Sequence, residues 1–209
     1  WWSSTFRQAV KTIGRTLLVL APWTAPVPLT RAWCIWEIFC TVDTDTELRV
    51  LLPAAERDAF ADALVRDFDS IVQVVCAVDV EKAEAHSDTD RDNIFAAVRE
   101  TCGFHKLNVA AAGGLRGALA LAGAQVLEER NAAGDEALGL AFKLAWLYKD
   151  QGKLDEAKAM YERALAGRER TLGADHPHTL GTVNNLAGLL NQVGDAAAAA
   201  ALRERFGCE

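Results

Sequence analysis

A repeat of 42 residues in the C-terminal third of the chain limits its possible folds more than any other feature. The matched pairs, all at this offset, are Leu138-Gly139 with Leu180-Gly181, Leu144-Ala145 with Leu186-Ala187, Gly152 with Gly194, Ala157 with Ala199, and Glu162-Arg163 with Glu204-Arg205. A constant offset predicts an array of helical hairpins, because such units stack to bury their apolar faces.

Each unit has the pattern of two close-packed helices joined by a tight turn. A glycine is predicted to make the turn, small residues to let the helices approach each other, and tyrosines to fill the remaining gaps. The residues with these structural roles are Tyr148, Gly152, Ala157, Tyr161 and Ala164, with Gly194 and Ala199 as counterparts in the second unit.

This pattern resembles the tetratricopeptide repeat, and specifically the 42-residue repeat of the kinesin light chains. The resemblance covers about residues 138–206. It rests on Leu144-Ala-Trp-Leu-Tyr-Lys-Asp-Gln-Gly-Lys-Leu-Asp-Glu-Ala157, Tyr161-Glu-Arg-Ala-Leu165, Leu172-Gly-Ala-Asp-His-Pro-His-Thr179 and Asn184-Asn-Leu-Ala187. The stretch around Ala196–Ala201, with Arg203 in the place of Tyr161, is typical of a degenerate or capping unit.

The resemblance implies a concave face that binds peptides or partner proteins. In that family asparagines of the first helix meet the bound chain, which implies a partner-binding role for Asn184, Asn185 and Asn191. An amide side chain suits this role because it offers both a donor and an acceptor to a peptide backbone. The alternative is that these asparagines only cap or solvate a helix.

Two histidines in the linker, His176 and His178, raise the question of a metal site. Pro177 between them gives no shared helical face, and no cysteine or carboxylate set completes a site. We therefore expect a turn role for both histidines and no metal site.

The N-terminal part has a different pattern, in which short apolar runs alternate with helical periodicity. Residues 15–20 and 48–52 read as strands, and helices are predicted before, between and after them, with Thr30 capping the helix that begins at Arg31. Strands joined through helices form parallel sheets. Phe60, Leu64, Phe68, Ile71 and Val75 predict one long helix after the second strand.

Glu37 is the lone carboxylate in an apolar helix. Burial without a partner would raise its pKa, and such carboxylates tend to mark functional sites. The simpler alternative is that Glu37 lies at the helix surface or pairs with a basic residue such as Arg49.

The runs Leu17-Leu-Val-Leu-Ala-Pro-Trp23 and Arg31-Ala-Trp-Cys-Ile-Trp-Glu-Ile38 resemble the strand, loop and helix of a Toll/interleukin receptor (TIR) domain. Trp33, Cys34 and Glu37 match its Trp-Cys-x-x-Glu element, which implies a catalytic role for Glu37 with NAD as substrate. Pro26, Pro28 and Thr30 stand where that family has a serine-rich loop, and its first strand and nucleotide loop are not in this sequence. Many TIR domains are assembly modules without catalysis.

The predicted fold class is therefore a partial TIR-like, flavodoxin-like α/β parallel-sheet segment followed by all-α tetratricopeptide hairpins. The predicted domains are 1–80 for the α/β segment, 81–136 for a helical connector and 137–209 for the repeats. Trp1 rather than Met opens the sequence, so we expect a fragment of a longer product with further strands upstream.

Composition excludes some partners. A net charge of −7, from 29 acidic and 22 basic residues, argues against nucleic acid, which needs a basic surface. Residues 107–127 form an apolar helix, but its alanines, glycines and central Arg116 favour a core helix over a membrane span. Five scattered cysteines without a CxxC pair indicate reduced thiols in the cytoplasm.

The sequence thus predicts a cytoplasmic scaffold that binds a protein or peptide partner, with no cofactor and no membrane or nucleic-acid partner. Self-association is a further possibility. The alternative function is a TIR-type NAD-cleaving enzyme whose repeats sense a ligand or drive assembly.

Overall fold

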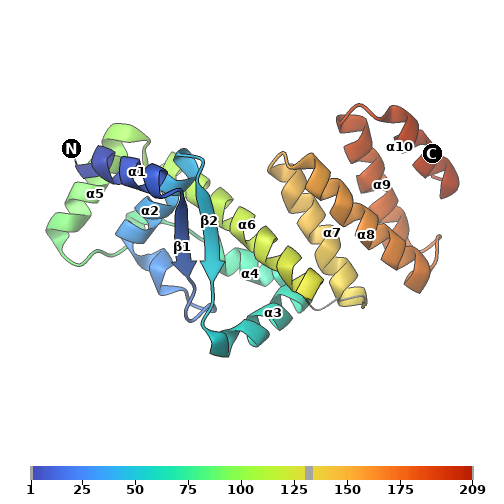
Figure 1. Ribbon diagram of the computed structural model, residues 1–209, viewed down its shortest axis with the longest axis horizontal. Helices are drawn as coiled ribbons and strands as arrows, with labels where there is room; N and C mark the ends of the chain where they lie inside the picture. The colour runs from blue at the N-terminus through green and yellow to red at the C-terminus, as the bar shows by residue number, and fades with distance from the viewer. Residues whose placement is uncertain (1, 130–133, 209) are drawn as a thin grey trace. The chain divides into compact units, whose positions relative to one another are not determined.

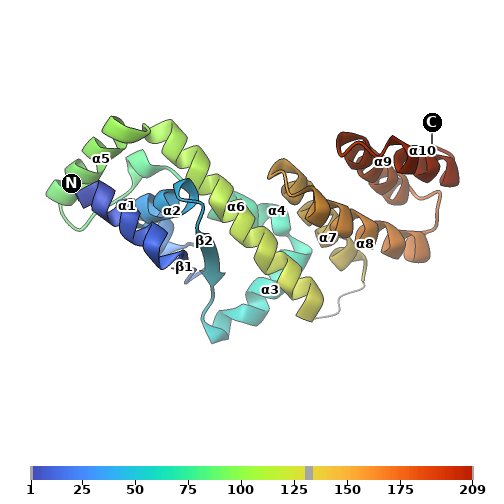
Figure 2. The ribbon, with the colours of Figure 1, turned by 45° about the horizontal axis from the view of Figure 1, so that its top comes forward.

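The computed structural model describes residues 2–129 and 134–208, which form two compact units. Unit 1 holds Trp1–Ala63 and Asp69–Leu119, and unit 2 holds Leu64–Phe68 and Ala120–Glu209. The described part of the chain is mostly helical (Figures 1 and 2). Each unit is described by itself below.

Unit 1 contains a short parallel sheet, as the sequence predicts. Strand β1 (Arg15–Val19) pairs with β2 (Glu47–Leu51) in one register, with Arg15 opposite Glu47 and Val19 opposite Leu51. Helix α1 (Trp2–Ile13) ends where expected, because Gly14 takes a φ of +76° that suits a helix C-terminus.

Helix α2 (Ala32–Asp43) covers one face of this sheet. Thr16 of β1 and Thr41 of α2 share a buried hydrogen bond of 2.7 Å, and Ile35, Ile38 and Cys40 of α2 have no exposed surface. The prediction of a largely buried helix is confirmed.

Thr30 does not cap α2, which corrects the sequence prediction. Its hydroxyl donates instead to the carbonyl of Val27 inside a short 3-10 turn, η1 (Val27–Thr30). The backbone N–H of Ala32 is bonded by the carbonyl of Glu84 at 2.8 Å, so a distant segment satisfies this helix start.

The long helix predicted from Phe60 to Val75 is two helices in the structure. After the turn η2 (Ala54–Glu56), α3 (Arg57–Arg66) ends before Asp67, and α4 (Phe68–Val75) begins after it. Aspartate competes for backbone groups and favours helix starts over helix interiors, which explains the break. All five of the predicted apolar residues are nevertheless buried.

Two further helices follow the turn η3 (Val80–Lys82). Helix α5 (Asp88–Thr101) starts at Ser87, whose hydroxyl accepts from the N–H of Asp90, and α6 spans Phe104–Glu129. Within the described residues, α6 is the one helix long and apolar enough to cross a membrane by length and composition. In unit 1 it packs as a core helix: Leu107 and Leu115 are fully buried.

Unit 2 contains the helices of the repeats. They are α7 (Asp135–Asp150), α8 (Leu154–Leu172), α9 (Pro177–Gln192) and α10 (Ala196–Arg205). Consecutive helices pack against each other, as the two views show (Figures 1 and 2). This order confirms the predicted pair of helical hairpins.

Candidate functional site

The two hairpin turns have the same backbone geometry, 42 residues apart. In the first, the N–H of Gly152 donates to the carbonyl of Lys149 and the N–H of Lys153 to that of Tyr148. In the second, Gly194 donates to Asn191 and Asp195 to Leu190. Gly152 and Gly194 have φ values of +73° and +87°, a region that favours glycine, so the predicted turn roles are confirmed.

The small residues of the repeats lie where the helices meet. Ala157 and Ala164 of α8 are fully buried, and so is Ala187 of α9, while Ala199 of α10 is almost fully buried. A buried methyl group in place of a longer side chain lets two helices pack closely. The predicted contact positions are therefore correct.

The two tyrosines also lie inside unit 2. Tyr148 donates from its hydroxyl to the carbonyl of Ala120 at 3.3 Å, so it ties the repeat to the end of α6. Tyr161 is fully buried and meets the ring of Phe142 edge-on at 5.6 Å. Its hydroxyl has no hydrogen-bond partner among the described residues, and burial raises its pKa.

Arg168 is a functional position of the packing that the sequence prediction missed. Its guanidinium donates to Thr182 Oγ1 at 2.8 Å and to the carbonyl of His178 at 3.2 Å, and it lies 4.9 Å from the centre of the Phe142 ring. It therefore joins α7, α8 and the start of α9. The spacing from Tyr161 and Ala164 to Arg168 is helical and was the signal that places it on the buried face.

The three predicted partner-binding asparagines all lie on α9. Asn184 and Asn191 are exposed, and because they are seven residues apart they share one face of the helix. Asn185 is half-buried, and its Nδ2 donates to the carbonyl of Gly181 at 2.8 Å. Two free amides and one partly engaged amide therefore occupy the predicted position.

A groove of about 560 Å³ lies elsewhere in unit 2, between α8, α9 and α10. Leu165, Leu186 and Leu190 form its apolar floor, and Lys158, Glu162, Glu169 and Arg205 lie at its charged rim. Arg205 bonds Glu169 at 2.7 Å, so α10 is tied to α8 across the groove. None of the three asparagines lines it, so the groove and the predicted partner face are distinct surfaces.

The linker histidines act at a helix start. His176 is the N-cap of α9: its Nδ1 accepts from the N–H of His178 at 3.2 Å, and Pro177 occupies the first helical turn. The predicted turn role is confirmed. The described residues contain no group of three or more potential metal ligands.

Glu37 lies in unit 1 on α2, half-buried beside Cys34. No hydrogen bond or ion pair engages its carboxylate among the described residues, and burial raises its pKa. Arg49 is bonded to Glu47 at 2.5 Å, so the pairing of Glu37 with Arg49 is wrong.

The other two residues of the predicted element do not add an active group. Burial is the main cause that raises the pKa of the Cys34 thiol, and Glu37 raises it further, so the thiol stays protonated near neutral pH. Trp33 packs its ring 6.0 Å from that of Phe6 on α1, which is a structural contact.

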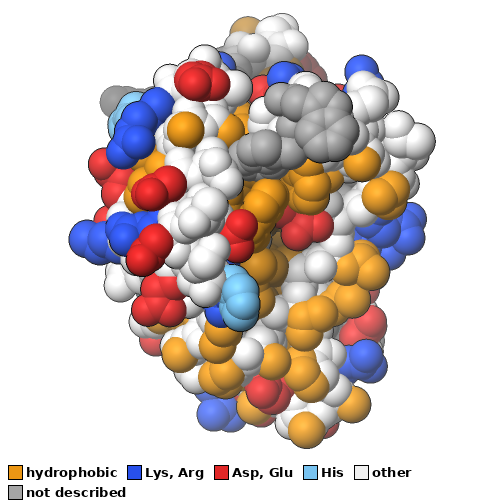
Figure 3. Space-filling model, turned by 90° about the vertical axis from the view of Figure 1, so that its left-hand side faces the viewer, with side chains coloured by type: hydrophobic (Ala, Val, Ile, Leu, Met, Phe, Trp, Pro, Cys, Tyr) orange, Lys and Arg blue, Asp and Glu red, His pale blue; other side chains and the backbone are white. Residues whose placement is uncertain are grey.

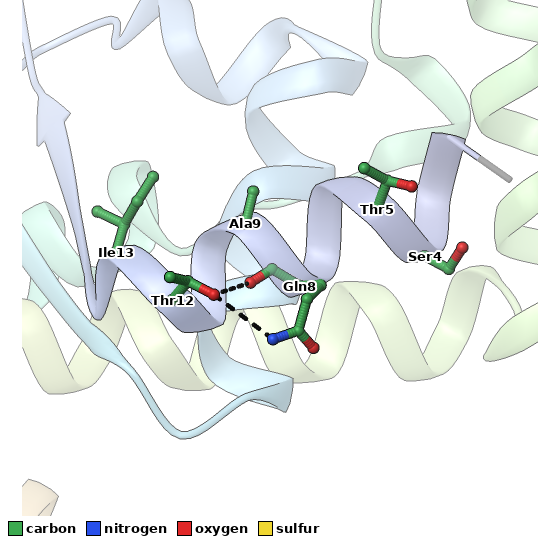
Figure 4. Close-up of a pocket in the computed structure, with 6 residues that line it drawn as sticks. All are labelled: Ser4, Thr5, Gln8, Ala9, Thr12 and Ile13. Carbon is green, nitrogen blue, oxygen red and sulfur yellow. Dashed lines mark hydrogen bonds between the residues drawn. The ribbon is translucent and has the colours of Figure 1, made fainter.

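Two hollows lie next to α1. One runs along an exposed side of α1, where Thr12 donates to the carbonyl of Gln8 and accepts from its side chain, so these polar groups satisfy each other (Figure 4). The other, of about 250 Å³, contains the ion pair of Arg7 and Asp43 beside Trp36. On the face seen in Figure 3, acidic and basic side chains surround a strip of hydrophobic ones.

Comparison with known proteins identifies the class of the repeats. Residues 143–178, which cover most of α7, all of α8 and the linker, match the tetratricopeptide repeat family. A search of curated proteins found no match. The chain thus carries a tetratricopeptide repeat, a class of helical hairpin that generally mediates protein–protein binding.

Proposed function

We propose that this chain is a protein–protein interaction scaffold whose repeats are of the kinesin-light-chain type. The observation that carries the proposal is the tetratricopeptide match at 143–178 together with the turn that recurs 42 residues later with the same hydrogen bonds. That period is the length of the kinesin-light-chain repeat. Five free cysteines support a reducing compartment, the cytoplasm.

The partner is a peptide or protein segment that lies on the concave face, against α9. Asn184 and Asn191 present free amides there, and Asn185 keeps its Oδ1 as an acceptor while its Nδ2 is engaged. Amides at this spacing suit the alternating N–H and C=O groups of an extended backbone. No cofactor is needed for such binding.

The test is a pull-down from cytosolic extract with the wild-type chain and with the Asn184→Ala/Asn185→Ala variant. We expect the variant to recover less of the partner, because each lost hydrogen bond costs roughly 0.5–1.5 kcal/mol. Helicity should not change.

The matched control is Lys158→Ala/Glu162→Ala at the rim of the groove. It removes two exposed polar side chains of opposite charge from α8 and leaves the net charge unchanged. Equal loss in both variants would show that the asparagines are not the contact surface. Equal recovery in the asparagine variant and the wild type would contradict the proposal outright.

A second candidate, NAD cleavage, is favoured by one observation: the Glu37 carboxylate is half-buried without a partner among the described residues. In a TIR-type enzyme it would stabilise the positive charge that develops on the ribose as nicotinamide leaves. The scaffold proposal predicts no nicotinamide release by the folded intact protein. Release that is lost in Glu37→Ala would establish the enzyme instead.

A further inference from the structure

One face of the sheet in unit 1 is open and partly apolar. Helix α2 covers the face of Thr16, whereas Leu17, Val19 and Leu51 point away from it and are 53%, 49% and 41% exposed. Parallel strands in proteins are normally covered on both faces, and a sheet of two strands is marginal by itself. The sheet therefore has the features of a surface that another element completes.

The outer edge of β1 is also open. The carbonyl of Gly14 accepts from Glu47 and the N–H of Leu20 donates to Leu51, so even-numbered residues of this strand bond to β2. The alternation of a strand then turns the N–H and C=O groups of Arg15, Leu17 and Val19 toward the free edge. No backbone hydrogen bond to another described element engages these groups.

This edge lacks the features that usually prevent strand pairing. Its register with β2 is continuous, without a bulge, and it contains no proline. Its one charged residue, Arg15, donates to Glu47 at 2.7 Å, so the charge is already neutralised. Unprotected edges of this kind pair with other strands.

We propose that β1 pairs antiparallel with β1 of a second copy of this chain, around a two-fold axis at Leu17. This register places Leu17 against Leu17 of the second copy and Val19 against the aliphatic stem of Arg15. The result is a four-stranded sheet in which the exposed leucines and valines of both copies adjoin.

The sequence of β1 favours a second copy over an unrelated strand, because its pattern is self-complementary. Centring the two-fold axis on Arg15 would oppose two arginines, which destabilises a pair of strands. Centring it on Leu17 avoids that contact and uses every outward backbone group of the strand. Two-fold interfaces of this kind bring the same surface together from both subunits.

The test is the dissociation constant of the 209-residue chain, measured by sedimentation equilibrium over a concentration series. We expect a dimer for the wild type. Leu17→Lys should raise the dissociation constant at least about tenfold, because it opposes two charges at the two-fold axis. Val19→Pro removes an outward N–H that β2 does not use and should act in the same direction.

Leu51→Lys is the matched control, because Leu51 is exposed on the same sheet face but belongs to β2. It should leave the dissociation constant within about twofold of the wild type. Circular dichroism checks that each variant is folded, and Leu17→Lys decides if Val19→Pro is not. A monomeric wild type, or a dimer that Leu17→Lys does not weaken, would overturn the proposal.

Discussion

A β-carbon at Gly167 would lie 2.1 Å from Cδ2 of Leu138, far inside van der Waals contact. Both residues are buried, so α8 and α7 meet where a glycine leaves room for a leucine. The first hairpin is therefore held by a close contact at this end as well as by the alanines near its turn.

Gly167→Ala should destabilise the repeats by about 1–3 kcal/mol, because the buried Leu138 has to move to admit a methyl group. Gly139→Ala is the control: Gly139 is also helical, but an added β-carbon there meets nothing within 4 Å. That change should stabilise by about 0.5–1 kcal/mol from helix propensity alone. Hydrogen exchange of the α7 and α8 amides measures both, and similar effects of the two changes would contradict the contact.

Ala157→Leu should also destabilise the first hairpin, by about 1–3 kcal/mol, since Ala157 is fully buried at the contact with α7. Ala159→Leu, two residues further along α8 and exposed, is the control and should stay within about 0.5 kcal/mol of the wild type. Chemical denaturation followed by circular dichroism gives both values. An unchanged midpoint for Ala157→Leu would mean that this register of α8 is wrong.

The turns and helix faces of the repeats were predictable because local sequence determines them. A glycine at 152 and again at 194 requires a backbone conformation that few other residues adopt, and the 42-residue offset repeats the whole hairpin. The strands β1 and β2 were predictable for a similar reason, since short apolar runs separated by a helix form a parallel pair.

Contacts between distant residues were not predictable in the same way. The start of α2 depends on the carbonyl of Glu84, about fifty residues away, which no local rule for Thr30 reveals. Gly167 looks like an ordinary weak helix residue until Leu138 is placed against it. The carboxylate of Glu37 was recognised from its apolar surroundings, but its lack of a partner needed the structure.

Arg168→Met should destabilise unit 2 by about 1–3 kcal/mol, because it removes the donors that reach Thr182 and the carbonyl of His178 in a buried site. Arg168→Lys should recover only part of this loss, because an ammonium lacks the planar fork of a guanidinium. Arg170→Met on the exposed side of α8 is the control. Equal stability of Arg168→Met and Arg170→Met in thermal unfolding would show that the buried contacts contribute nothing.

Glu37→Gln should stabilise unit 1 at neutral pH and have little effect in acid. Burial raises the pKa of Glu37 in the folded protein above its unfolded value. The stabilising contribution of this group is therefore complete below the unfolded pKa, and it is lost as the pH rises through the folded pKa. Glutamine has the shape of the protonated acid and does not titrate, so the difference between variant and wild type should grow with pH over that window. Urea unfolding at a series of pH values, followed by tryptophan fluorescence, measures it. Glu47→Gln is the control of opposite sign, because hydrogen bonds from Arg49 and Arg15 lower the pKa of Glu47 and make its charged form the stable one. A gain from Glu37→Gln that is the same at every pH would show that the carboxylate is solvated in the folded protein, and it would remove the one observation that favours a catalytic role.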